Sequence, residues 1–182
     1  MRKNKQTLEA NDKTRGFTLI EILVVLFIIS IVTTVALLTI SRNENRKLEA
    51  FTKTFIQRMT LAEEQAMLQP SVLGLAIEGN EYQFARYQPA QGEKKSFWEP
   101  TFDALLSHYA IPDDIELNIE VDGKKTVMKS HENENQKYFP QIVISTNGDI
   151  TPFKIYVAKT GASPRYVISG DESGNITSQL LT

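Results

Sequence analysis

Residues 17–40 read FTLIEILVVLFIISIVTTVALLTI, an apolar run of 24 residues with one charged side chain, Glu21, and neither glycine nor proline. At about 1.5 Å per residue, a helix of this length reaches about 36 Å, enough to cross a hydrocarbon core of about 30 Å. A secretory signal peptide has a shorter apolar run that ends at a small-residue cleavage site, whereas this run continues into charged and polar residues. We therefore expect residues 17–40 to form a membrane helix that is retained.

Glu21 is the one residue that does not fit an ordinary membrane helix. A carboxylate inside a membrane helix costs about 2.5–3.5 kcal/mol, and somewhat less near the end of the helix. Two interpretations follow from this cost. Either Glu21 has a cationic partner and a functional role, or it lies at the interface and reaches the headgroups.

The residues around the start of the apolar run favour the first interpretation. Gly16-Phe17-Thr18-Leu19-Ile20-Glu21, preceded by Lys13-Thr14-Arg15, resembles the type IV prepilin signature of pilins and type II secretion pseudopilins. The resemblance implies that a prepilin peptidase cuts between Gly16 and Phe17 and that the new amino group of Phe17 is methylated. It also implies that Glu21 pairs with the amino terminus of a neighbouring subunit during assembly. A buried carboxylate needs such a cation.

The helical pattern continues beyond the apolar run. Apolar side chains recur at steps of three and four, which indicates one buried stripe on an amphipathic helix: Leu48, Phe51, Phe55, Met59, Ala62 and Ala66. Pro70 ends the pattern. We expect one helix from about residue 17 to residue 69, in which residues 41–69 continue the membrane half into a folded domain.

Residues 70–182 are predicted to form a β-rich domain. Segments with a period of two are predicted as strands at 72–77, 81–87, 115–121, 142–145, 153–158, 166–169 and 175–179. Turns are expected at 78–80, 147–149 and 171–174, a short helix around 102–109 and a mobile loop at 129–137. The predicted fold class is α+β, a long N-terminal helix packed on a small antiparallel β-sandwich or pair of sheets.

The domain also resembles the H-type minor pseudopilin of type II secretion. The segments that carry the resemblance are the Leu-Gly-Leu-Ala-Ile strand at 73–77, residues 111–121, and the stretch 140–145 followed by Asn-Gly-Asp-Ile-Thr-Pro-Phe at 147–153. The family implies a minor subunit of the periplasmic pseudopilus that helps to push exoproteins through an outer-membrane channel. The other pseudopilins, the prepilin peptidase and the inner-membrane secretion platform are the partners it implies.

Composition excludes several other functions. The chain has no cysteine, which excludes disulfides and thiol chemistry. Residues 1–16 carry a net charge of +3, which leaves −5 for the rest of a chain of net charge −2, a poor match for nucleic acid. His108 and His131 stand alone, and Asp171, Glu172 and Asn175 are explained by a tight turn, although they could also contribute oxygens to calcium. We expect no cofactor, no metal and no enzymatic activity.

The predicted organisation is a leader (1–16), a membrane helix (17–40), an amphipathic helix (41–69) and a periplasmic domain (70–182). Lys and Arg are equally frequent on both sides of the apolar run, so the orientation follows from the prepilin resemblance. It places the N-terminus in the cytoplasm and the domain in the periplasm, with a single pass through the bacterial inner membrane. The predicted function is that of a minor pseudopilin of type II secretion. The alternative is a minor pilin of a type IV pilus or DNA-uptake machine.

Overall fold

The computed structural model describes residues 17–92, 95–101, 103, 105–126 and 139–181, and within its helix the side chains of residues 36–44 lie outside this description. Two compact units are present, Met1–Arg42 and Asn43–Thr182. The expected leader, including Gly16, and the expected loop at 129–137, including His131, lie outside the described residues.

Helix α1 runs without interruption over Leu19–Leu68. It ends two residues before Pro70, whose ring and missing N–H cannot continue a helix. The predicted stripe is the buried face of its second half, since Leu48, Phe55, Met59, Ala62 and Ala66 are at most 5% exposed. Phe51 is partly buried and packs against the same core.

Two antiparallel sheets of five strands each follow the helix. The first sheet has the order β3-β2-β1-β7, with β4 also paired to β2. Its strands are β1 (Leu73–Glu78), β2 (Glu81–Gln88), β3 (Phe97–Pro100), β4 (Tyr109–Ala110) and β7 (Ile142–Ile144). The second sheet has the order β10-β9-β8-β5-β6. Its strands are β5 (Ile115–Val121), β6 (Lys124–Thr126), β8 (Phe153–Lys159), β9 (Tyr166–Gly170) and β10 (Ile176–Leu180).

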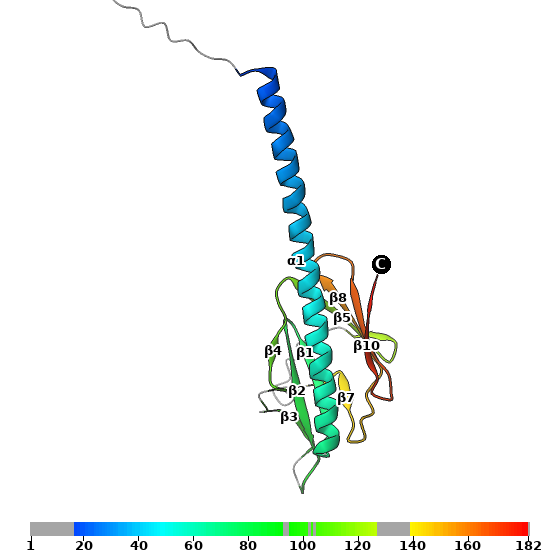
Figure 1. The fold of residues 1–182 in the computed structure, drawn as a ribbon. Helices are drawn as coiled ribbons and strands as arrows, with labels where there is room; N and C mark the ends of the chain where they lie inside the picture. Colours follow the sequence, from blue (N-terminus) through cyan, green and yellow to red (C-terminus); the bar gives the residue numbers. More distant parts are fainter. Residues whose placement is uncertain (1–16, 93–94, 102, 104, 127–138, 182) are drawn as a thin grey trace, which may run out of the picture. The chain divides into compact units, whose positions relative to one another are not determined.

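The second half of α1 runs along both sheets, with β1 to β4 on one side of it and β8 and β10 on the other (Figure 1). One continuous core joins the three parts. Phe55 from the helix meets Tyr82 of β2 with ring centroids 5.1 Å apart, and the inward residues of the second sheet, such as Ile155 and Ile168, belong to the same cluster. The predicted fold class, a long helix on a pair of antiparallel sheets, is confirmed.

One local prediction needs correction. No helix occurs among the described residues of 102–109, because Leu105 and Leu106 form a turn that buries Leu106 and Tyr109 begins β4. The pairing of Tyr109 with Tyr82 of β2 overrides the local pattern. The predicted turn at 147–149 is present and is closed by an antiparallel bridge between Ile144 and Ile150, and it leads from β7 in the first sheet to β8 in the second.

The turns at 147–149 and 171–174 both lie close to the C-terminal end of α1. A Cβ placed on Gly148 would lie 2.9 Å from Sδ of Met67, and one on Gly174 would lie 2.4 Å from Oε1 of Glu63. Both glycines have positive φ, at 91° and 83°, which also favours glycine. The end of the helix therefore limits the space at both turns, which also lie against each other, since a Cβ on Gly174 would lie 2.8 Å from the backbone oxygen of Gly148.

Candidate assembly site

The first turn of α1 is closed by a reciprocal pair of hydrogen bonds. The backbone N–H of Glu21 donates to Oγ1 of Thr18 at 3.3 Å, and the backbone N–H of Thr18 donates to Oε2 of Glu21 at 3.5 Å. This is a capping box, in which Thr18 precedes the first helical residue and Glu21 is the third residue of the helix. The N-terminal N–H groups of a helix have no partner within the helix, and its positive end favours a carboxylate.

The prepilin resemblance implies a role of Glu21 toward a neighbouring subunit only, whereas the structure shows this second role within the chain. The signal was present, because Thr18-Leu19-Ile20-Glu21 followed by apolar residues matches the capping-box pattern. The capping bond uses one oxygen of a carboxylate that can accept about four hydrogen bonds. The geometry therefore leaves acceptor capacity on Glu21 for a further donor.

The surface behind this turn is apolar in every direction. Phe17, Leu19 and Ile20 are 78%, 84% and 69% exposed, and large apolar side chains remain exposed as far as Val35. The three hydroxyl groups in this part of the helix are turned inward: Ser30, Thr33 and Thr34 each donate to the carbonyl oxygen four residues earlier at 2.8 Å. A hydroxyl that is satisfied on its own helix needs no water, which suits an apolar environment.

Within the described part of the chain, no helix is both long and apolar enough to span a membrane.

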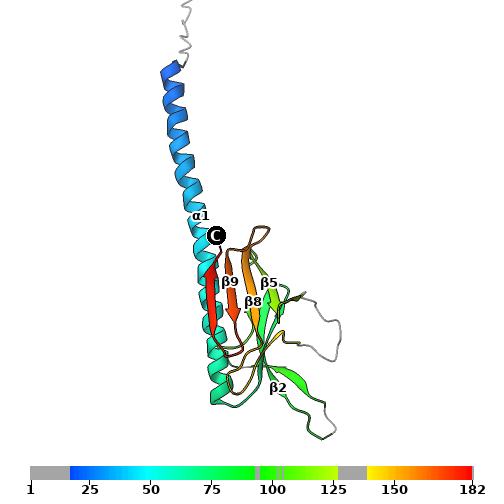
Figure 2. The ribbon, with the colours of Figure 1, turned by 90° about the vertical axis from the view of Figure 1, so that its right-hand side faces the viewer.

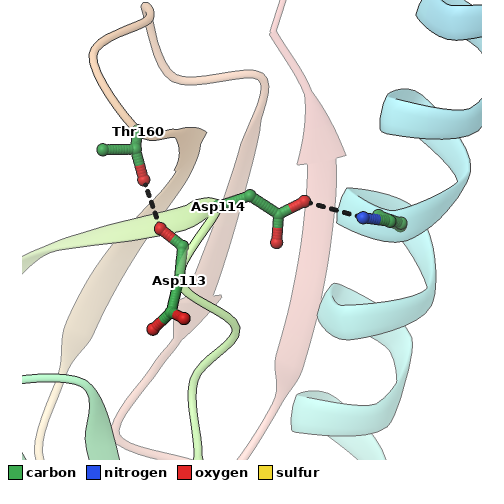
Figure 3. Close-up of polar contacts among 4 residues, drawn as sticks. Asp113, Asp114 and Thr160 are labelled. Carbon is green, nitrogen blue, oxygen red and sulfur yellow. Dashed lines mark hydrogen bonds and ion pairs between the residues drawn. The ribbon is translucent and has the colours of Figure 1, made fainter.

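The second half of the helix is tied to the domain by polar contacts as well as by the core. Lys47 Nζ lies 2.9 Å from Oδ2 of Asp114, just before β5, and Oγ1 of Thr160, after β8, donates to the backbone oxygen of Asp113 at 2.9 Å (Figure 3). The hydrogen bond from Lys47 lowers the pKa of Asp114 below its ordinary value. Both partners of the ion pair are exposed, so it contributes little to stability.

Arg58 forms a partly buried cluster with Tyr82 and Tyr109. It donates a hydrogen bond to the Tyr82 hydroxyl, and its guanidinium lies 3.3 Å from the centre of the Tyr109 ring. Burial raises the pKa of Tyr82, and the hydrogen bond from Arg58 opposes this rise. The contact of Arg58 with Tyr109 helps to explain why β4 forms where a helix was expected.

The described side chains that were considered as possible metal ligands do not form one cluster. His108 is half-exposed and its Nε2 lies 2.6 Å from Oε2 of Glu81. Oδ1 of Asp171 accepts the backbone N–H groups of Ser173 and Asn175, both at 3.0 Å, so it closes the turn between β9 and β10. Among the described residues, no three His, Asp or Glu side chains are grouped as a metal site would require.

A capped, outwardly apolar helix whose second half packs on antiparallel sheets defines the class of prepilin-type proteins. The family model of the prokaryotic N-terminal methylation motif matches residues 11–37. Type II secretion system protein H of Pseudomonas aeruginosa is 31% identical over 157 residues, which cover 84% of this chain and 87% of that protein. The protein of the same name from Aeromonas hydrophila is 28% identical, covering 88% and 91%.

The chain belongs to the family of type II secretion system protein H. The fold agrees. The minor pseudopilin EpsH from the type 2 secretion system of Vibrio cholerae superposes with a TM-score of 0.57 at 20% identity, covering 74% of this chain and 94% of that one. The solution structure of Escherichia coli GspH gives a TM-score of 0.55 at 18% identity, covering 76% and 89%.

Proposed function

We propose that this chain, a minor pseudopilin of the type II secretion system by its family, acts as a structural subunit that packs into the pseudopilus through its N-terminal helix. The observation that carries the proposal is the first turn of α1, where a capped carboxylate begins a helix that is apolar on all sides. Such a helix can exchange lipid for the apolar helices of other subunits. The domain then presents its outer faces to neighbours and carries out no turnover of its own.

The prepilin peptidase would cut between Gly16 and Phe17, and Phe17 would then be N-methylated. The match of the methylation motif to residues 11–37 supports this processing. Before processing and assembly, the apolar run at 17–40 would anchor the chain in the inner membrane, with its leader in the cytoplasm and its domain in the periplasm. The secretion platform in that membrane is the proposed partner during extraction.

Glu21 would pair with the methylated amino group of a neighbouring Phe17. The capping bond supports this role, because it aims the carboxylate at the N-terminal end of the helix, where amino termini of packed neighbours would lie. The cation would also repay the cost of keeping a carboxylate in apolar surroundings.

Two variants of Glu21 separate pairing from capping. Glutamine can serve in a capping box but carries no charge, whereas leucine removes both. We expect Glu21→Gln and Glu21→Leu to reduce secretion alike, with no change in the melting temperature of the domain. Oxidative cross-linking of Val25→Cys, in a chain with no other cysteine, to a single cysteine introduced into the same helix of another pseudopilin reports on packing between the two. Normal secretion and cross-linking by Glu21→Gln would show that only capping matters.

Processing is tested by intact mass. Protein from native membranes should begin with N-methylated Phe17. Retention of Met1 in cells with active prepilin peptidase would contradict the proposed cleavage.

A further inference from the structure

Strand β10 is the outermost strand of the second sheet and pairs with β9 only (Figure 2). In Figure 2, where β10 passes in front of α1, no further strand of the sheet lies beyond it. Residues Thr177 to Leu181 are exposed, with Leu180 53% and Leu181 36% exposed. A long edge strand in solvent is a feature that proteins normally protect.

The hydrogen bonds next to β10 show which of its backbone groups are unused. The N–H of Leu181 donates to the oxygen of Arg165 at 2.7 Å, and the oxygen of Asn175 accepts from the N–H of Asp171 at 3.2 Å. Backbone groups of an antiparallel strand alternate in direction, so the odd-numbered residues from 175 to 181 face β9. The N–H and C=O groups of Ile176, Ser178 and Leu180 therefore point outward from the sheet.

The edges formed by β3, β7, β6 and the uncovered part of β5 are protected. β3 ends in Pro100, which cannot donate a hydrogen bond. The N–H and C=O groups of Val143 in β7 are both bound by Thr151. β6 carries Lys124 and Lys125, and the part of β5 that it leaves uncovered carries Glu116.

No protection of this kind is found on β10. It reads Ile-Thr-Ser-Gln-Leu, and residues 173–182 include no charged residue and no proline. Charge, proline and short length are the usual means by which an edge avoids pairing. An edge of five residues without any of them has the chemistry of a site for strand addition, in which main-chain hydrogen bonds supply affinity and alternate side chains supply specificity.

We propose that β10 is a docking edge that accepts an extended, uncharged segment of a neighbouring pseudopilin. The segment would bond to the outward groups of Ile176, Ser178 and Leu180 and would extend the second sheet by one strand. The absence of charge on β10 excludes recognition by ion pairs and favours an uncharged partner segment. The exposed Leu180 and Leu181 offer apolar contacts beside the new strand. The choice of partner rests on the proposed function.

The test is residue-resolved amide exchange by NMR on the full-length processed chain in detergent micelles, alone and mixed with the other pseudopilins of its own secretion system. Alone, the amides of Thr177, Gln179 and Leu181 should exchange slowly, and those of Ile176, Ser178 and Leu180 quickly. In the mixture, the last three should slow by at least about tenfold. Unchanged exchange at these three amides in a mixture that co-purifies as a complex would overturn the docking edge while leaving the proposed function intact.

The other outcomes point to other occupants. Loss of co-purification altogether would instead contradict the proposed function. Slowing that appears in the chain alone as its concentration rises would identify a second copy as the occupant. Slowing that requires a secreted protein would identify a substrate, and either result would overturn the proposal.

A pair of variants at one position checks the same point in cells. Ser178→Pro removes an outward N–H and leaves the bonds to β9 in place, so it should weaken complex formation and secretion by at least about tenfold. Ser178→Ala keeps the N–H and should behave as the parent does. Equal secretion by both variants would refute strand addition. If Ser178→Pro fails to fold, the exchange measurement decides alone.

Discussion

Replacement of Phe55 by alanine tests how far the second half of α1 and the sheets form one cooperative unit. The Phe55 ring is 1% exposed and lies 5.1 Å from the Tyr82 ring and 6.2 Å from the Phe51 ring. Truncation of a buried phenylalanine costs about 3–5 kcal/mol, and the two ring contacts favour the middle of that range or above. We expect a loss of about 4 kcal/mol in the free energy of unfolding.

For a domain of this size, about 1 kcal/mol corresponds to about 3–4 °C, so the melting temperature should fall by about 12–16 °C. The assay is thermal unfolding followed by the fluorescence of Trp98, the single tryptophan of the chain, which lies in the first sheet. Its signal reports on a sheet that the mutated helix covers, so a shift there measures the coupling directly.

Phe27→Ala is the matched control, because it removes the same ring from a position that is 64% exposed in the other compact unit. It should leave the Trp98 transition unchanged. A fall of less than about 4 °C for Phe55→Ala would show that the helix stripe contributes little to the stability of the domain, and the packing argument would fail.

Gly74→Ala should lower the free energy of unfolding by about 1–3 kcal/mol and alter Trp98 emission. The reason is that the new Cβ would lie 2.5 Å from Pro140 and 2.9 Å from the Trp98 ring. Melting and emission equal to those of the parent would contradict this prediction. Glu63→Gln should raise the melting temperature at pH 7, because burial raises the pKa of Glu63 above its ordinary value of 4.5 and the neighbouring Glu64 adds to this. A raised pKa in the folded state means that stability is greatest below the unfolded value and is lost as pH rises through the folded value. The advantage of Gln should therefore vanish near pH 4, and an equal or lower melting temperature at pH 7 would refute the assignment.

Much of the fold could be predicted because its elements follow simple periods. The stripe from Leu48 to Ala66 and the alternation of residues 115–121 are local patterns that mark buried faces directly. The pairing of strands is not local. Residues 142–144 and 153–159 lie close in sequence, yet they join different sheets, and no period in the sequence distinguishes this arrangement from a hairpin.

The prediction of a short helix around 102–109 was wrong for a related reason. Leu106 and Tyr109 have helical spacing, but contacts with Arg58 and Tyr82 determine the position of Tyr109. Arg58 and Tyr82 lie 51 and 27 residues earlier in the chain. At the candidate site, the prepilin signature identified Glu21 but not its local bond to Thr18. The family resemblance implies only the role between subunits, whereas the helix-start pattern Thr18-Leu19-Ile20-Glu21 predicts the local bond.

The glycine turns of the domain are of two kinds. Those at Gly148 and Gly174 lie against Met67 and Glu63 of the helix, whereas others have open space around them. A side chain at Gly148 or Gly174 would collide with the helix, so any added residue in those turns would have to displace it. Gly79, Gly123 and Gly161 also have positive φ, but nothing lies within 4 Å of a Cβ built on them. An epitope tag or fluorescent label belongs at Gly123 or Gly161, where the inserted chain can leave the surface without moving a strand. Such a label would make the subunit visible in living cells.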